Sequence, residues 1–210
     1  MLDYESLLRW SENQWEKSIL PSLSEFISIE ALSPGFEPKW EEKGELSATL
    51  DLFQNWADVQ GIDGLESHRF KLEGRTPLLI IKVKGSLPGE ILFYSHLDKQ
   101  PSKPDLWSDG LSPFVGKRRG EWLYGRGSID DGYGGYLCIS AIKALQAHGM
   151  DHPSATFLIE TCEESGSYDL PAYLDHCTPY LGNPDLVVVM DSGGPDYDHI
   201  WKTDALRGLK

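Results

Sequence analysis

The segment ILFYSHLD, residues 91–98, places a short apolar run directly before a histidine and an aspartate. Ile91 to Tyr94 have the apolar and aromatic character of a buried strand. His96 and Asp98 are two residues apart, so in an extended chain their side chains point to the same side. A carboxylate placed in this way accepts one imidazole N–H and leaves the other ring nitrogen for a metal ion. Taken alone, the segment is more typical of a surface histidine beside an aspartate than of a metal ligand.

Around this segment the chain alternates between strand-like and helix-like stretches. Apolar runs predict strands at residues 67–72, 78–83, 91–94, 122–124, 155–161 and 186–190. Apolar residues at three- and four-residue steps predict helices at residues 3–30, 44–60, 136–147 and 170–175. The alternation favours an α/β sandwich. Residues 186–190 are almost wholly apolar, so we expect burial on both faces, as in a parallel sheet covered by helices.

The composition is that of a folded, acidic protein. Hydrophobic residues make up 40% of the 210 residues, and the formal net charge is −14. A chain this acidic repels nucleic-acid phosphates and anionic lipid, so nucleic-acid and membrane-surface partners are excluded. The first residues lack the pattern of a secretory signal, and three scattered cysteines make no disulfide framework. We therefore expect a soluble, cytoplasmic protein whose cysteines are reduced and mostly buried.

A glycine-rich segment, GRGSIDDG at residues 125–132, presents two adjacent aspartates ahead of a predicted helix. A dinucleotide-binding loop needs a third glycine where Asp130 stands, and two carboxylates there would repel a pyrophosphate. The segment also lacks the Gly-Lys-Ser/Thr of a nucleoside-triphosphate loop. Asp130 and Asp131 are therefore either metal ligands or an acidic helix N-terminus stabilised by the helix dipole.

Two further acidic groups come directly after predicted strands. Glu163 and Glu164 follow the strand at 155–161, and Asp191 follows the strand at 186–190. Each group alone is also typical of a solvated strand end. In a hydrolytic site, the two glutamates would have different tasks, because one carboxylate binds the metal and the other accepts a proton from water.

The four polar groups are spaced regularly. His96, Asp130, Glu163–Glu164 and Asp191 follow one another at intervals of 34, 33 and 27 residues, each about the length of a strand–helix–strand unit. Ligands of α/β proteins bind outside the carboxyl ends of the strands, so these groups are expected to meet at one sheet edge. Nitrogen and oxygen donors without thiolate suit zinc, cobalt or manganese. A carboxylate shared between two ions would indicate a two-metal hydrolase.

These motifs resemble those of the zinc-dependent co-catalytic metallopeptidases and deacylases. The resemblance rests on His96-Leu97-Asp98, on residues 124–131, on Glu163-Glu164 and on Asp191. The family includes carnosinase-type dipeptidases, glutamate carboxypeptidase, aminoacylase, acetylornithine deacetylase and succinyl-diaminopimelate desuccinylase. The resemblance implies a three-layer α/β sandwich with a mostly parallel mixed sheet, of the phosphorylase/hydrolase-like kind.

The resemblance also implies four metal ligands for two zinc ions. His96 and Asp191 would bind one ion, Glu164 would bind the other, and Asp130 would bridge both. Cobalt or manganese is possible in place of zinc. The other histidines, His68, His148, His152, His176 and His199, match no ligand position of the family.

Two further acids would act beside these ligands. Asp98 would orient His96. Glu163 would be the general base, taking a proton from water and delivering it to the leaving amine. A serine or cysteine hydrolase is not indicated, because the chain has no Gly-x-Ser-x-Gly turn and none of its cysteines is in a recognisable nucleophile turn.

The sequence departs from the family pattern at two places. Gly132-Tyr133-Gly134-Gly135 follows the double aspartate, where relatives usually carry lysine or another residue. Relatives also continue into a lid or dimerisation domain and return with a last histidine for the second zinc, and residues 206–210 look like the strand where that crossing begins. We therefore expect residues 1–210 to be the N-terminal portion of a catalytic domain, without the lid that forms the family homodimer and without the C-terminal segment.

The expected function is hydrolysis of an amide bond in a dipeptide or short peptide, with the 210-residue chain inactive on its own. Asp191 and the segment HLDKQP at residues 96–101 favour the dipeptidase branch of the family. An N-acyl amino acid deacylase is the nearest alternative, and substrate profiling separates the two. A non-catalytic metal-binding or interaction module is the alternative from another class. It would bind zinc without turnover.

Overall fold

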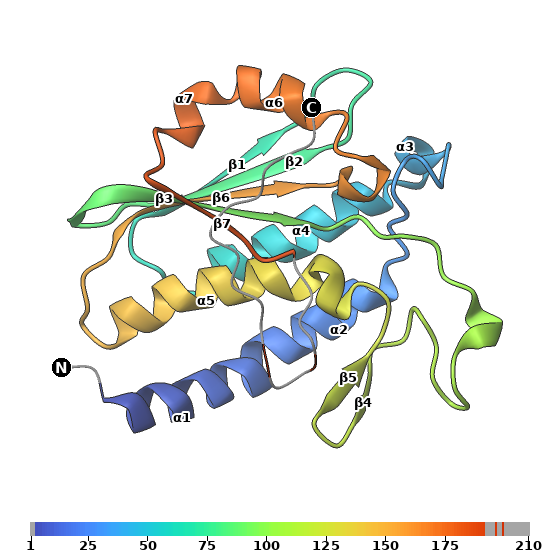
Figure 1. Ribbon diagram of the computed structural model, residues 1–210, viewed down its shortest axis with the longest axis horizontal. Helices are drawn as coiled ribbons and strands as arrows, with labels where there is room; N and C mark the ends of the chain where they lie inside the picture. Colours follow the sequence, from blue (N-terminus) through green and yellow to red (C-terminus); the bar gives the residue numbers. More distant parts are fainter. Residues whose placement is uncertain (1–2, 192–195, 197–198, 200–210) are drawn as a thin grey trace.

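A computed structural model describes residues 3–191, 196 and 199 of the chain. A five-stranded sheet has helices on both faces, and a two-stranded hairpin lies beside it (Figure 1). The strands are β1 (Leu65–Phe70), β2 (Leu78–Val83), β3 (Leu87–His96), β4 (Lys117–Arg119), β5 (Trp122–Tyr124), β6 (Pro153–Glu160) and β7 (Leu186–Val189). The helices are α1 (Tyr4–Gln14), α2 (Leu20–Ser28), α3 (Trp40–Lys43), α4 (Glu45–Asp58), α5 (Tyr133–Ala147), α6 (Leu170–His176) and α7 (Thr178–Leu181). Two π-helical segments, Trp15–Ile19 and Ser128–Gly132, and two 3-10 turns, Pro104–Leu106 and Glu163–Ser165, are also present.

The five-stranded sheet is mixed, with the strand order β1-β2-β6-β3-β7. The pairs β6–β3 and β3–β7 are parallel, whereas β1–β2 and β2–β6 are antiparallel. The predicted α/β class with a mixed sheet is confirmed. Among the five described strands of this sheet, parallel pairing is confined to β6, β3 and β7, and in this half of the sheet His96 at the end of β3 pairs with Glu160 at the end of β6. The carboxyl ends of the strands that precede the candidate site residues therefore lie side by side.

Helices cover both faces of the sheet and make three layers (Figure 1). On one face, buried side chains of α2, α4 and α5 pack on the sheet around Phe53 and Tyr136. Figure 1 shows α6 and α7 on the opposite face, where Tyr173 and Cys177 pack with Leu158 of β6 in a smaller apolar cluster. Residues 155–160 of β6 are buried throughout, because both layers of helices cover this central strand.

The N-terminal helical stretch is interrupted. A helix was expected over residues 3–30, and the structure has α1 and α2 joined by the π-helical segment Trp15–Ile19. Pro21 lies in the first turn of α2. Its ring nitrogen has no hydrogen to donate to the helical ladder, which accounts for a change in hydrogen-bonding pattern just before it. Leu23, Phe26 and Ile27 form the buried stripe of α2.

The glycines after the double aspartate bring α5 close to its neighbours. α5 begins at Tyr133 and includes Gly135, where a Cβ atom would lie 2.9 Å from the Phe53 ring and 3.1 Å from the Ser95 hydroxyl. A larger residue would push the helix away from the sheet. The departure from the family pattern at residues 132–135 therefore permits close helix packing directly behind Asp130.

The expectation of two-sided burial for residues 186–190 is wrong. The strand there, β7, pairs with β3 on one side only and is the edge strand within the described part of the sheet. Leu186, Val187 and Val189 are about half exposed, at 53%, 53% and 46%. The apolar run correctly predicts a strand, but it does not show how many layers cover it. The strand expected at residues 206–210 lies outside the described residues.

Candidate metal centre

The imidazole of His96 is at the centre of the candidate site. The backbone of β3 ends at His96, and the side chain is completely buried. Its Nδ1 atom lies 3.2 Å from the backbone oxygen of Asp98 and 3.3 Å from Asp98 Oδ1. Its Nε2 atom is buried and has no hydrogen-bond partner among the described residues. A histidine fixed through one ring nitrogen with the other unpartnered is in the arrangement of a metal ligand.

Asp98 joins the end of β3 to the turn that follows β6. Its carboxylate is completely buried and accepts the backbone N–H of Glu163 at 3.2 Å and that of Glu164 at 3.0 Å. The same carboxylate faces His96 Nδ1. Asp98 therefore fixes both the histidine and the pair of glutamates, a role for which a carboxylate is suited because it accepts several N–H groups at once.

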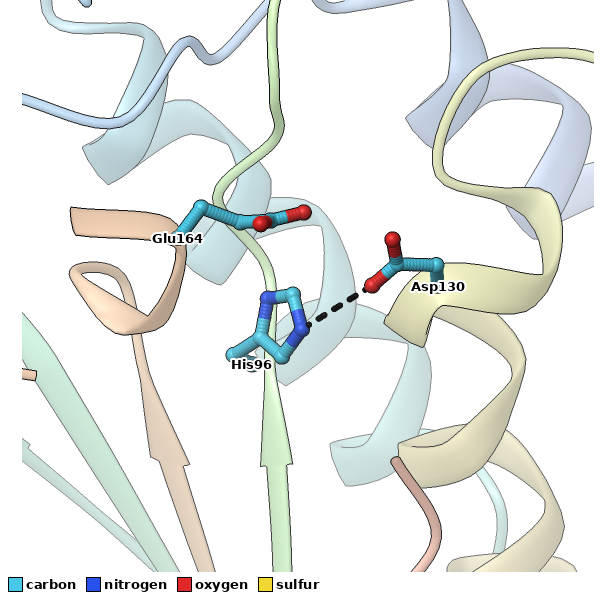
Figure 2. Close-up of side chains that lie close together, drawn as sticks. All are labelled: His96, Asp130 and Glu164. Carbon is cyan, nitrogen blue, oxygen red and sulfur yellow. Dashed lines mark ion pairs between the residues drawn. The ribbon is translucent and has the colours of Figure 1, made fainter. Parts of the chain in front are cut away.

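Three further carboxylates surround His96 Nε2. The nearest oxygens lie at 3.4 Å (Asp130), 3.8 Å (Asp191) and 3.9 Å (Glu163). Figure 2 shows Asp130, ahead of α5, and Glu164, from the turn after β6, on either side of the imidazole at the end of β3. The ligand atoms form two groups, His96–Asp130–Glu164 and His96–Glu163–Asp191, and within each group all atoms lie within 4.8 Å of one another. The structure thus brings all of the predicted strand-end groups together.

The two glutamates differ in how their side chains are held. Gln100 donates its Nε2–H to Glu164 Oε2 at 2.6 Å, and Glu164 Oε1 is buried without a partner. Among the described residues, no side chain donates a hydrogen bond to the carboxylate of Glu163, which is 32% exposed. Glu164 is therefore the more firmly placed of the two, and Glu163 is the freer.

The charges of the site are unbalanced. Burial alone would lower the pKa of His96, but the nearby carboxylates of Asp130 and Asp98 outweigh it and raise the pKa to about 11. Burial raises the pKa of Asp131 to about 8 and that of Glu164 to about 7. Burial also raises the pKa of Glu163. The carboxylates gathered around His96 repel one another at these distances, and a divalent cation between them would offset that repulsion.

The donor atoms at the site fit zinc. They are an imidazole nitrogen and carboxylate oxygens, some of them buried and unpartnered, which are the donors that zinc shares with cobalt and manganese. All three cysteines are buried and free, and none belongs to the two ligand groups. Among the other histidines, His148 and His152 make hydrogen bonds elsewhere, to Ala144 and to Gln146 and Pro153.

Several residues that support the site were not predicted from the sequence. Tyr94 donates its hydroxyl to Glu160 at 2.6 Å, and Ser167 donates to the same carboxylate oxygen at 2.8 Å. Two of them, Tyr94 and Glu160, could have been predicted from their positions. Tyr94 precedes His96 by two positions, and Glu160 ends a strand predicted to be buried. No sequence pattern predicted the hydrogen bond from Gln100 to Glu164. The same holds for the backbone N–H of His96, which donates to Asp131 Oδ2 at 3.3 Å.

The chain belongs to the peptidase family M20/M25/M40, whose model matches residues 92–205. It is 33% identical over 121 residues to a human Beta-Ala-His dipeptidase, covering 55% of this chain and 24% of that protein. It is 32% identical over 130 residues to a succinyl-diaminopimelate desuccinylase of Sphingopyxis alaskensis, covering 61% of this chain and 31% of that protein. The fold resembles the crystal structure of human carnosine dipeptidase 1, with a TM-score of 0.71 and 24% identity over 90% of this chain and 41% of that chain.

The matched relatives are much longer than this chain, which spans about a quarter to a third of the two curated proteins. Comparison with the carnosine dipeptidase structure supports the fold, and the matched segment 92–205 includes every candidate site residue. Within the described residues, no helix is both long and apolar enough to cross a membrane.

Proposed function

We propose that residues 1–210 form the N-terminal portion of the catalytic domain of a two-zinc hydrolase that cleaves an amide bond in a dipeptide or short peptide. The observation that carries this proposal is the gathering of carboxylates from Asp130, Glu163 and Asp191 within 3.4 to 3.9 Å of the buried His96 Nε2, beside Glu164. Membership of a peptidase family and the similarity to a dipeptidase support the reaction class. The net charge of −14 supports a substrate other than nucleic acid.

Four residues would hold the metal ions. His96 and Asp191 would bind the first zinc, Glu164 would bind the second, and Asp130 would bind both. The hydrogen bond from Gln100 supports Glu164 as the ligand of the glutamate pair, because its carboxylate is already fixed. When bound, zinc supplies Lewis acidity, which polarises a carbonyl group and makes water acidic near neutral pH. Cobalt and manganese could serve in the same set of donors.

Glu163 would be the general base. Its carboxylate is partly exposed, lies 3.9 Å from His96 Nε2 and has a pKa raised by burial. A carboxylate with a raised pKa is a stronger base towards water, and near neutral pH its protonated form persists long enough to deliver the proton to the leaving amine. Asp98 would hold His96 in orientation through Nδ1 and would fix the backbone N–H of Glu163.

The proposal extends to the location of the protein, its substrate and its assembly. We propose a cytoplasmic location, which the three buried, free cysteines support because reducing compartments keep thiols unpaired. The small-molecule partner would be a short peptide. The family homodimer would form through a lid domain that belongs to the longer protein.

A deacylase acting on N-acyl amino acids is the second candidate, favoured by the 32% identity to the desuccinylase. Both candidates hydrolyse an amide bond, so the site chemistry above serves either. They differ in the group on the acyl side of the bond, and the residues of this site do not distinguish between the two groups.

The test is substrate profiling of the full-length, zinc-loaded protein against unmodified dipeptides and N-acyl amino acids. We expect dipeptides to be hydrolysed, with activity lost on treatment with a chelator and restored by zinc. Preference for N-acyl amino acids would favour the deacylase. A folded, zinc-loaded protein that hydrolyses neither class would contradict both enzymes and indicate the non-catalytic metal-binding module.

A further inference from the structure

A buried lysine follows Asp98 directly. The side chain of Lys99 is completely buried, and its ammonium group donates to three backbone carbonyls at or just beyond the end of α2. The distances from Nζ are 2.8 Å to the oxygen of Phe26, 3.4 Å to that of Ile27 and 2.5 Å to that of Ile29. Nζ also lies 4.0 Å from the centre of the Phe26 ring. A cation at the C-terminus of a helix is favourably placed, but burying it is costly, so its position calls for an explanation.

The stem of Lys99 supports the turn that presents Asp130. Gly127 begins this turn with a φ of +84°, and a Cβ atom there would lie 2.7 Å from Lys99 Cε and 3.0 Å from the Phe26 ring. Only glycine allows both this backbone conformation and this close approach. Lys99 and Phe26 together therefore form the surface against which Gly127 packs, three residues before Asp130.

Hydrogen bonds also connect the backbone of Lys99 with the turn Glu163–Ser165, the glutamate turn. Its N–H donates to the oxygen of Ala31, and its carbonyl accepts the N–H of Ser33, both at 3.0 Å. Ser33 in turn shares a hydrogen bond of 2.6 Å between its hydroxyl and that of Ser165, which lies in the turn Glu163–Ser165. One residue thus connects α2 with both turns that carry the candidate carboxylates.

We propose that Lys99 is a positioning residue for the metal centre: by binding the carbonyls at the end of α2, its ammonium group holds the Asp130 turn at the distance from His96 that metal binding requires. This inference rests on the proposed metal site and goes beyond it, because Lys99 is not a ligand and does not touch the substrate. Its effect passes through Gly127 to Asp130.

The charge on Lys99 depends on pH. Burial lowers its pKa to about 7, while the carboxylates of Glu45 and Glu30 raise it and the guanidinium of Arg126 lowers it further. At pH 6 the ammonium form has three N–H donors for its three carbonyls. At pH 9 the neutral amine has two donors, and its lone pair opposes a carbonyl oxygen. The positioning effect should therefore be present at pH 6 and weakened at pH 9.

The test compares zinc affinity of the full-length protein with that of Lys99→Met, by competition with a chromophoric chelator at pH 6 and pH 9. Lys143→Met is the matched control. Its Nζ is partly buried and donates to Gln14 at 3.1 Å and Gln60 at 2.9 Å, away from the site. We expect Lys99→Met to bind zinc about tenfold more weakly than the parent at pH 6, the size of effect typical of groups that support metal ligands. At pH 9 the difference should shrink, and Lys143→Met should match the parent at both values.

Each other outcome has a definite meaning. Equal zinc affinity of Lys99→Met and the parent at pH 6, or the same loss at both pH values, would overturn the role of the ammonium group while leaving the metal site standing. Lys99→Gln, which keeps two N–H donors, replaces the methionine variant if that does not fold. If neither variant folds, Lys99 is a residue of general stability and the proposal fails. A parent protein that binds no zinc would overturn the proposed function, and this inference with it.

Discussion

Glu163→Gln in the full-length protein is expected to lower kcat by about 10³-fold, the size of effect that general bases contribute, while the zinc content stays at the parent value. Glutamine has nearly the shape of glutamate but accepts no proton at neutral pH. The Glu163 carboxylate lies 3.9 Å from His96 Nε2 and receives no hydrogen bond from a described side chain, so its amide causes little rearrangement. Turnover under substrate saturation and metal content by mass spectrometry provide the two measurements.

Glu164→Gln is the matched control for this change. Gln100 donates to the Glu164 carboxylate, and the proposed role of that carboxylate is to bind the second zinc. We expect Glu164→Gln to lower both zinc content and turnover, in contrast to the neighbouring variant. If instead Glu163→Gln loses zinc and Glu164→Gln keeps it, the roles of the two glutamates are reversed.

Asp98→Asn is expected to weaken zinc binding by about 10- to 100-fold and to lower the free energy of unfolding by about 1–3 kcal/mol. The Asp98 carboxylate accepts the backbone N–H groups of Glu163 and Glu164 and also faces His96 Nδ1. An asparagine has only one oxygen for these donors, so its NH₂ group opposes at least one N–H in a completely buried position. Both His96 and the glutamate turn lose their fixed orientation.

The control for this variant is Asp169→Asn. Asp169 is also buried, at 3% exposure, and accepts the backbone N–H of Thr76 at 2.9 Å and the guanidinium of Arg75 at 2.8 Å. Its substitution should lower the unfolding free energy by a similar amount, measured by urea denaturation, without changing zinc affinity. Equal zinc affinity in Asp98→Asn and the parent would show that Asp98 serves the fold and not the metal.

The meeting of the strand-end groups was predictable because one geometric rule produces it. His96 ends β3, Glu163 and Glu164 follow β6, and parallel pairing of these strands places their carboxyl ends together. The regular intervals between polar groups carried that information in the sequence. The sequence does not show that Glu164 is held more firmly than Glu163, because this depends on a single hydrogen bond from Gln100 in a loop.

Other features depend on contacts between segments far apart in the chain. Lys99 looks like an ordinary charged residue in the sequence, and its burial results from the position of α2, about 70 residues earlier. The exposure of β7 likewise depends on its place at the edge of the described sheet. Hydrophobic patterns record the local tendency to form a strand or helix, but not which neighbour covers it.

The most direct test of the account is the zinc content of the purified, zinc-equilibrated full-length protein, measured by mass spectrometry beside a folded His96→Ala variant. His96 would bind the first zinc and lies 3.4 Å from Asp130, which would bind both ions, so its loss should affect the whole centre. We predict about two zinc ions per chain in the parent, as in two-metal hydrolases, and a clear loss in His96→Ala. A folded parent protein with no more zinc than His96→Ala would contradict it.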